Sequence, residues 1–356
     1  MAQPSDNAAK GPSSHREAAL SSYLQPEGEH AAPGELAPLT CRFAPSPTGR
    51  MHAGNIFASL ASWLLARKTG GKVVLRIEDL DRDRSKDCFI DQVARDYEAL
   101  GLDWDEGPYF QRNRDAAYQE AFAKLEDTGL VYPCFCTRAD LHAASAPHAG
   151  QSSVYAGTCR NLTADERAAK AAEAERAGRL GPSYRLAVPP SGNAEGAFAT
   201  DDVFQGPCRF DLGSDSGDFV VRRSDLAFAY QLAVVVDDAE HGVTCVVRGI
   251  DLVESVPRQM YLQRLLGFSH PLYAHVPLLV AEDGRRLAKR NRDAGFDALL
   301  EEHKTPEGVL GYIAGVTGLK DDFEPASAQE LLEGFDVARC RARWQGKISI
   351  TWPSAR

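Results

Sequence analysis

The sequence predicts an α/β fold in which a parallel sheet is interrupted by an inserted domain. Residues 39–77 contain a short strand, a helix and a buried apolar strand, and this order is typical of a right-handed βαβ unit. Residues 130–224 break the alternation with segments rich in Gly, Pro and Asp. The α/β pattern returns from about residue 225, so we expect one sheet built from two stretches of chain.

Within the first stretch, at 41–129, the apolar run at 73–77 predicts a strand buried on both faces, and Gly70-Gly71 ends the preceding helix. The expected elements of this stretch are a strand at 39–44, a helix at 52–68, a strand at 73–77, and helices at 89–100 and 114–128. Residues 1–40 lack a sustained apolar period, so we expect a disordered extension with at most local packing at 22–24.

The inserted domain, at 130–224, is expected to carry a short Ala-rich helix at 164–177. The second stretch, at 225–282, is expected to begin with a strand because its first apolar segment is a run of β-branched residues. Its expected elements are strands at 230–237 and 243–248 and a helix at 257–266. Residues 283–356 begin with a basic loop and are expected to be mostly helical, at 296–319 and 326–344.

The charge balance narrows the class of function. The 356 residues include 40 Lys and Arg against 50 Asp and Glu, a formal net charge of -10. This argues against a broadly basic nucleic-acid coat, whose affinity depends on many phosphate contacts, but it leaves room for an enzyme with a local basic patch. The eight cysteines are scattered, and we recognise no secretory leader or membrane-spanning apolar run. We therefore expect reduced thiols, no membrane partner and a cytoplasmic location.

The first candidate site is the segment 42–55, where a Pro-rich turn leaves a strand and delivers His-x-Gly at a helix start. Helix N-termini bind anions through free backbone N–H groups and the helix dipole. Gly54 would let a nucleotide approach the backbone closely, and His52 would donate to a phosphate oxygen. The alternative is an ordinary βα loop with Asn55 as a capping residue.

The second candidate is the segment 76–82, at the carboxyl end of the second strand, where open α/β sheets bind ligands. A carboxylate there suits an ammonium group, and we assign this role to Glu78. We expect Asp79 and Asp81 to cap the next helix instead.

The third candidate is the stretch 284–292, which holds five cations. A charge run alone is most often a solvated loop. After a strand of a nucleotide-binding fold, the same loop can neutralise a triphosphate.

Together these segments resemble the class I aminoacyl-tRNA synthetases. Arg-Phe-Ala-Pro-Ser-Pro-Thr-Gly at 42–49 and Arg-Ile-Glu-Asp at 76–79 resemble the glutamyl branch specifically. His52-Ala53-Gly54-Asn55 resembles the "HIGH" motif with its last His replaced, and the segment 286–290 resembles the "KMSKS" loop with Lys289 kept. The resemblance covers about 41–319. It implies a Rossmann-like sheet, an inserted zinc-bearing acceptor-type domain and a C-terminal helical stem-contact region.

Chain length distinguishes the full-length members of the glutamyl branch from its truncated paralogues. Only 64 residues follow Arg292, so we expect no anticodon-binding domain. The chain is then most similar to the truncated glutamyl-tRNA synthetase paralogues. This implies tRNA-independent activation of L-glutamate with ATP to glutamyl-adenylate, then transfer of glutamate to the queuosine base of the tRNA(Asp) anticodon. We expect a monomer.

Three alternatives remain open. The closest is a conventional glutamyl-tRNA synthetase catalytic module that charges the 3′ end of tRNA(Glu). The others are a small-molecule adenylate-forming enzyme and a non-catalytic relic of a synthetase.

The resemblance also implies roles for single residues. His52 and Lys289 would be catalytic, and Gly54 and Asn55 would join them in binding ATP, with Mg²⁺ on the triphosphate. The residues expected to bind glutamate are Arg42, Phe43, Ala44, Pro45, Ser46, Glu78, Tyr230 and Arg248. The alternative for Arg248 is a surface ion pair with Asp251 or Glu254. For the transfer step, the candidate bases are the adenylate phosphate, Asp237 and Asp238.

The cysteines at 134, 136 and 159 form a cluster within the insertion. Cys134, Cys136, Tyr155 and Cys159 resemble the zinc site of the truncated paralogues, a closed structural set of four ligands. His142 and His148 are alternative fourth ligands on imidazole chemistry. The other alternative is three ordinary buried thiols.

Overall fold

The computed structural model describes residues 17, 20–24, 36–81, 83–137, 139–140, 154–285, 287 and 295–353. Its first layer is the parallel sheet β1-β2-β3, with Phe43 opposite Leu75. The elements of this stretch are β1 (Thr40–Phe43), α2 (Ala53–Lys68), β2 (Lys72–Ile77), α3 (Asp87–Ala99), β3 (Glu106–Phe110), η1 (Gln111–Asn113) and α4 (Asp115–Asp127). The predicted βαβ unit is therefore confirmed, whereas the sequence reading did not include β3.

The turn between α2 and β2 explains the Gly70-Gly71 pair. Gly70 adopts φ +68°, a left-handed conformation that favours glycine. A Cβ on Gly71 would lie 2.0 Å from the Leu39 carbonyl oxygen, so only glycine fits against the start of β1.

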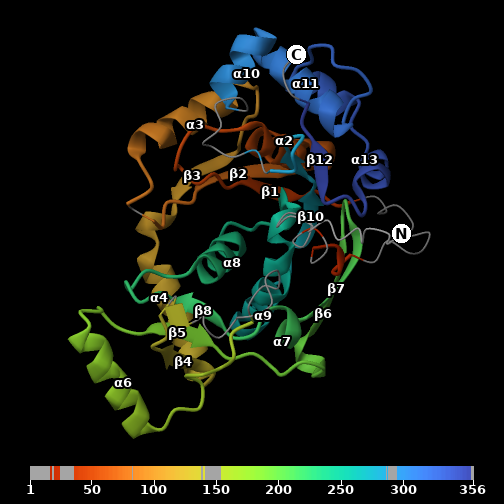
Figure 1. The fold of residues 1–356 in the computed structure, drawn as a ribbon. Helices are drawn as coiled ribbons and strands as arrows, with labels where there is room; N and C mark the ends of the chain where they lie inside the picture. The colour runs from red at the N-terminus through yellow and green to blue at the C-terminus, as the bar shows by residue number, and fades with distance from the viewer. Residues whose placement is uncertain are drawn as a thin grey trace, which may run out of the picture.

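The insertion contains a second, antiparallel sheet of order β4-β5-β8 and a separate hairpin of β6 and β7. Figure 1 shows α6 projecting at the lower left, away from the β1-β2-β3 sheet. The elements are β4 (Val131–Cys134), α6 (Ala164–Arg176), β5 (Ser183–Leu186), η2 (Ala194–Gly196), β6 (Ala197–Asp202), β7 (Gly206–Asp211), α7 (Leu212–Asp215) and β8 (Phe219–Arg222).

The parallel arrangement then resumes beside β1, where the Thr244 N–H donates to the Thr40 carbonyl at 2.9 Å. The parallel pair of β9 and β10 places Arg248 opposite His275. The elements are α8 (Tyr230–Glu240), β9 (Cys245–Gly249), η3 (Ile250–Ser255), α9 (Val256–Leu266) and β10 (Leu272–Val276).

The expected strand at 230–237 is wrong, because these residues begin the helix α8. Residues 232–238 are all buried, and Figure 1 places α8 centrally, between the β1-β2-β3 sheet and the elements of the insertion. A helix that is buried all round shows no polar face, so its apolar run is indistinguishable from that of a buried strand.

The C-terminal region is mostly helical, as predicted, but the expected helix at 296–319 is broken at Lys304, which has φ 68°. Trp344 is fully buried and meets Phe57 of α2 edge-on at 5.2 Å between ring centroids. The elements are β11 (Leu278–Val280), α10 (Phe296–His303), α11 (Pro306–Thr317), α12 (Ala328–Glu333), α13 (Val337–Trp344) and β12 (Ser349–Thr351). None of the helices in the described ranges is long and apolar enough to cross a membrane.

Part of the N-terminal extension is packed: the local packing considered at 22–24 is confirmed, and it extends to Leu20. Leu20, Tyr23 and Leu24 are buried, and Leu24 forms an antiparallel bridge with Cys208 of β7. These three side chains belong to the same buried apolar cluster as Phe210 of the hairpin, and their burial stabilises the ordered segment. The other residues before 36, apart from 17 and 20–24, lie outside the described part of the chain.

Candidate functional site

A cavity of about 250 Å³ lies where the carboxyl ends of β1, β2 and β9 meet the N-termini of α2 and α8. This is the edge at which open α/β sheets bind ligands. The structure brings nearly all the predicted site residues together here. Those that line the cavity are Arg42, Phe43, Ala44, Pro45, His52, Gly54, Asn55, Glu78, Tyr230 and Arg248. Ser46 lines a neighbouring cavity that shares Pro45, Asn55 and Glu78 with the first. Lys289 lies outside the described residues, as does most of its loop.

His52 is the N-cap of α2. Its Nδ1 accepts from the Gly54 N–H at 3.1 Å, and the Asn55 side chain accepts from the His52 N–H at 3.3 Å. The capping role considered for Asn55 is therefore confirmed, and it coexists with a place in the cavity wall. Because Nδ1 accepts a hydrogen bond, the neutral imidazole carries its proton on Nε2 and can donate it.

Glu78 is held by a buried cation that the sequence reading did not single out. Arg76 is 0% exposed, and its Nη2 donates to Glu78 Oε1 at 3.2 Å. Burial raises the pKa of Glu78, and the positive charges of Arg76 and Arg42 partly oppose this rise. The pocket thus contains a carboxylate whose ionised form depends on neighbouring guanidinium groups.

Arg42 and Arg248 supply the positive charge of the cavity. Arg42 is 4% exposed, donates to the Val247 carbonyl at 2.8 Å, and lies 3.5 Å from Asp238. Arg248 is 5% exposed, which excludes the surface ion pair considered as its alternative. Its Nε donates to His275 and its Nη1 to Gln259, whereas its Nη2 is buried and has no hydrogen-bond partner among the described residues.

The two acids considered as bases for the transfer step are engaged elsewhere. Asp237 is fully buried and accepts hydrogen bonds from Gln111, Arg114 and Tyr118. Asp238 accepts from Arg76 at 2.5 Å, and the positive charges around it lower its pKa against the opposing effect of burial. Asp238 therefore supports Arg42 and Arg76, whereas Asp237 joins α8 to the start of α4.

The cysteine cluster lies in the insertion, away from the first cavity. The sulfur atoms of Cys134, Cys136 and Cys159 all lie within 4.8 Å of one another. The Tyr155 hydroxyl is 3.4 Å from Cys134 Sγ and 3.5 Å from Cys136 Sγ. The structure thus brings all four predicted ligands together, and the alternative ligands His142 and His148 lie outside the described residues.

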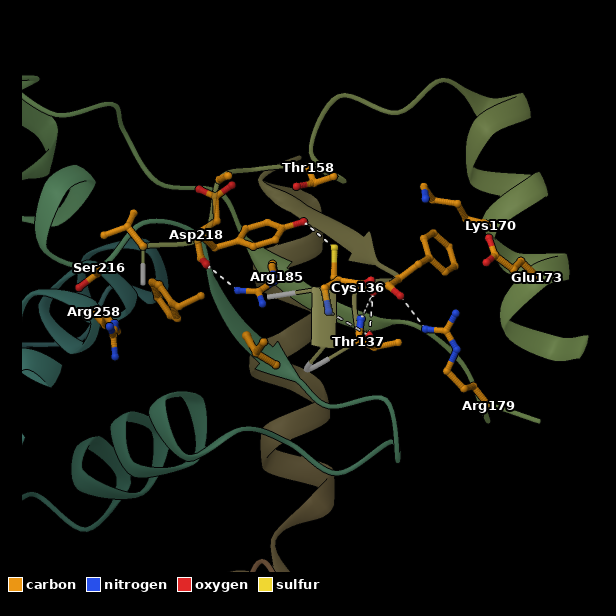
Figure 2. A pocket seen from close by; sticks show the side chains of 17 residues that line it. Cys136, Thr137, Thr158, Lys170, Glu173, Arg179, Arg185, Ser216, Asp218 and Arg258 are labelled. Carbon is orange, nitrogen blue, oxygen red and sulfur yellow. Dashed lines mark hydrogen bonds between the residues drawn. The ribbon is translucent and has the colours of Figure 1, made fainter. Parts of the chain in front are cut away.

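A larger cavity of about 730 Å³ adjoins this cluster. Figure 2 shows cationic side chains from several segments around it, including Lys170 of α6, Arg179 and Arg185. The Arg185 guanidinium lies 3.9 Å from the centre of the Tyr155 ring, and its Nε donates to Cys134 Sγ at 3.3 Å. Arg185 therefore supports two of the predicted ligands at once.

The sequence reading missed several residues that shape the first cavity: Arg76, Tyr97, Asp202, Leu252, Gln259 and His275. His275 carried a usable signal, because it is a polar residue in an apolar strand-like run before the carboxyl end of β10. Asp202 carried none, since it belongs to the insertion and meets the sheet only through the tertiary fold.

Comparisons with known proteins agree with this geometry. Residues 38–341 match the family model described as tRNA synthetases class I (E and Q), catalytic domain. The chain is 46% identical over 309 residues to a glutamyl-Q tRNA(Asp) synthetase of Symbiobacterium thermophilum, covering 84% of this chain and 92% of that protein. It is 42% identical over 311 residues to a glutamyl-Q tRNA(Asp) synthetase of Leptothrix cholodnii, covering 86% and 98%.

Longer relatives match over part of their length. A glutamate–tRNA ligase of Geotalea uraniireducens is 38% identical over 298 residues, covering 83% of this chain and 60% of that protein. The crystal structure of a glutamate–tRNA synthetase from Elizabethkingia anophelis shares the fold, with a TM-score of 0.72 at 22% identity, covering 88% of this chain and 68% of the other. The chain therefore belongs to the class I tRNA synthetases of the E and Q catalytic-domain family, and within it to the glutamyl-Q tRNA(Asp) synthetases.

Proposed function

We propose that this protein activates L-glutamate with ATP in the absence of tRNA and then transfers the glutamyl group to the queuosine base of the tRNA(Asp) anticodon. The observation that carries the proposal is the cavity that combines Glu78, Arg42 and Arg248 with the N-terminus of α2. The near-full-length similarity to proteins named glutamyl-Q tRNA(Asp) synthetase supports this choice of acceptor.

In the first step, an oxygen of the glutamate α-carboxylate attacks the α-phosphorus of ATP, and the bond to pyrophosphate breaks. A carboxylate is a nucleophile at neutral pH, so positioning and charge stabilisation supply the catalysis. His52 and the positive end of the α2 helix dipole face the phosphates in this arrangement, with Gly54 allowing close approach. Lys289 stabilises the charge that develops on pyrophosphate, and Mg²⁺ accompanies the triphosphate.

Charge complementarity selects the amino acid. The ionised Glu78 carboxylate attracts the substrate ammonium group, and Arg42 and Arg248 attract its carboxylates. A guanidinium group pairs with a carboxylate through two parallel hydrogen bonds, and a neutral side-chain amide cannot accept both. Phe43, Ala44, Pro45, Ser46 and Tyr230 complete the glutamate pocket. Glutamate is therefore preferred over glutamine.

In the second step, a hydroxyl of the queuosine cyclopentene-diol attacks the adenylate carbonyl carbon, and AMP leaves. The engagement of Asp237 and Asp238 with cations favours the adenylate phosphate as the group that accepts the hydroxyl proton.

The four ligands in the insertion fit a structural Zn²⁺ ion. A tetrahedral ion with Zn–S bonds of about 2.3 Å requires neighbouring sulfurs about 3.8 Å apart, and Cys136 and Cys159 are separated by 3.6 Å. The Tyr155 hydroxyl lies at a similar distance from two of the sulfurs. Three sulfurs and one oxygen form a closed set with no position for a substrate, so the ion would cross-link the end of β4 to residues 155–159.

The decisive experiment measures ATP-dependent incorporation of radiolabelled glutamate into three RNAs: tRNA(Asp) with queuosine, the same tRNA without queuosine, and tRNA(Glu). Cleavage of the product into anticodon and 3′-terminal fragments locates the label. We expect label only in the anticodon fragment of the queuosine-containing tRNA. Label at the 3′ end of tRNA(Glu) would replace the proposal with the conventional glutamyl-tRNA synthetase reaction.

A further inference from the structure

Arg248 is contacted by a buried pair, Asp202 and His275, that has no role in the proposed steps. His275 lies opposite Arg248 on β10, and its Nε2 accepts from Arg248 Nε at 3.1 Å. The other ring nitrogen, Nδ1, lies 2.6 Å from a carboxylate oxygen of Asp202. Both side chains of the pair are inaccessible to solvent.

Asp202 is itself fixed by the backbone. It ends β6 of the inserted hairpin, and its Oδ1 accepts from the N–H groups of Phe204 and Gln205 at 3.0 and 2.9 Å. The His275 N–H also donates to this carboxylate at 3.1 Å. The carboxylate is therefore oriented by the turn of the hairpin and by β10 together.

This arrangement sets the tautomer of His275. Burial lowers the pKa of His275 below 6.5, although the negative charge of Asp202 acts in the opposite direction. In the neutral ring, Nδ1–H donates to Asp202 and Nε2 keeps the lone pair that Arg248 requires. A proton on Nε2 would place two donors face to face.

A second acceptor fixes the rest of the guanidinium plane. Gln259 Oε1 accepts from Arg248 Nη1 at 2.9 Å, and the Gln259 amide in turn donates to Gln231. Two of the three guanidinium nitrogens thus have protein acceptors, while Nη2 is buried without one among the described residues. A buried donor without an acceptor is costly, and the Arg248 side chain lines the cavity in which the glutamate carboxylate is proposed to bind.

We propose that Asp202 and His275 are positioning residues for glutamate, because together they present a neutral imidazole acceptor that fixes the orientation of the Arg248 guanidinium group in the wall of the glutamate cavity. The inference rests on the proposed role of Arg248 in glutamate binding. It makes the affinity for glutamate depend on the inserted hairpin, since Asp202 belongs to β6 and not to the parallel sheet.

The first test is Asp202→Asn in the full-length protein, assayed by glutamate-dependent ATP–pyrophosphate exchange. The amide keeps an oxygen for the turn N–H groups but places an NH₂ against His275 Nδ1, which moves the ring proton to Nε2. We expect the KM for glutamate to rise on the order of tenfold to a hundredfold, as for the loss of a hydrogen bond to a charged group, with the KM for ATP nearly unchanged.

The matched control is Asp201→Asn, the same change one residue earlier on β6. Asp201 pairs with Arg341 at 2.8 Å instead of with His275, so both KM values should stay at the wild-type level. Equal glutamate KM values for folded Asp202→Asn and wild-type protein would overturn the inference. A parallel rise of both KM values with a fall in Tm would also overturn it, in favour of a purely structural role.

The second test compares His275→Gln with His275→Leu, and it decides the matter if Asp202→Asn does not fold. The Gln carbonyl can accept from Arg248 Nε and should restore much of the glutamate affinity, whereas Leu offers no acceptor and should lose it. Equal glutamate KM values for the two variants would contradict the proposal. Arg248→Ala distinguishes a failure of this inference from a failure of the proposed function. If this variant retains normal exchange, the proposed role of Arg248 in glutamate binding is itself wrong.

Discussion

In the glutamate pocket, the orientation and hydrogen-bond partners of single side chains depend on burial in the folded chain more than on the local sequence. Arg248 is the penultimate residue of the apolar strand β9, yet two of its guanidinium nitrogens have acceptors and the third has none in the described part of the chain. Arg76 likewise is a fully buried cation shared by Glu78 and Asp238. Both residues have geometries that a substitution of like charge does not reproduce.

We predict that Arg248→Ala abolishes glutamate-dependent pyrophosphate exchange while the far-ultraviolet circular dichroism stays native. Arg248→Lys should also lose at least about tenfold in kcat/KM, because a single ammonium group cannot keep the bonds to His275 and Gln259 and still reach the substrate. Arg223→Ala, which removes an exposed Arg paired with Asp225, is the matched control and should retain normal exchange. Near-normal activity of Arg248→Ala would refute the assignment.

The pKa of Glu78 gives a prediction for pH dependence. Burial raises this pKa above its ordinary value of 4.5, so the carboxyl gains its proton at a higher pH than an exposed Glu. A protonated Glu78 does not attract an ammonium group, and the KM for glutamate should therefore increase as the pH falls toward the acid range. Steady-state exchange kinetics from neutral to acid pH measure this, and a flat KM profile would contradict the role.

The same shift has a consequence for stability. When the native pKa of a carboxyl exceeds its unfolded value, the native state binds more protons between the two values, and stability falls as the pH rises through that window. At neutral pH the ionised Glu78 therefore lowers the free energy of unfolding, although substrate binding requires its charge. Glu78→Gln should keep or increase the Tm at pH 8 while abolishing exchange. A large fall in Tm together with the loss of activity would indicate a structural role instead.

At the scale of elements, the sequence predicts those whose pattern is local. The helix α2 has a capping residue at its start and a Gly-Gly stop, and β2 is an uninterrupted apolar run, so both were predicted to within about two residues. The β-branched run of α8 was misread because burial on all sides removes the helical periodicity. Strand β3 was missed because Glu106–Phe110 shows no apolar alternation.

The same distinction between local sequence patterns and tertiary contacts applies to the residues of the candidate site. Motif residues on the loops after β1 and β2 were found from sequence, because the carboxyl ends of parallel strands converge on one edge. Asp202 and Gln259 were not found, because their role depends on contacts made only in the folded chain.

The antiparallel sheet of the insertion ends at the predicted metal ligands, which gives a prediction at the element scale. Cys136→Ser should lose bound zinc, measured by metal analysis of the purified protein, because a neutral hydroxyl replaces a thiolate ligand. Cys88→Ser changes an exposed cysteine on α3 and should keep the wild-type zinc content. Zinc content that is unchanged in Cys136→Ser would exclude the proposed ligand set.

At the scale of the whole molecule, segments far apart in the chain pack against one another. Tyr23 packs against Phe210 of β7 at 5.4 Å between ring centroids, the Tyr23 carbonyl accepts from the Arg209 N–H, and Glu17 accepts from Ser349 at the start of β12. The N-terminal segment thus joins the inserted hairpin to the C-terminal strand. The hairpin in turn contributes Asp202 to the support of Arg248.

This connection predicts that the N-terminal segment stabilises the fold although its sequence looks dispensable. Leu20 is 1% exposed, and Leu20→Ala should lower the free energy of unfolding by about 2–5 kcal/mol, the usual cost of truncating a buried Leu. Leu180→Ala, at a Leu that is 80% exposed, is the control and should change it by less than about 0.5 kcal/mol. Urea unfolding followed by tryptophan fluorescence measures both values. If Leu20→Ala unfolds like wild type, the segment is an independent tail, and the hairpin that carries Asp202 is held by its contacts with the sheet alone.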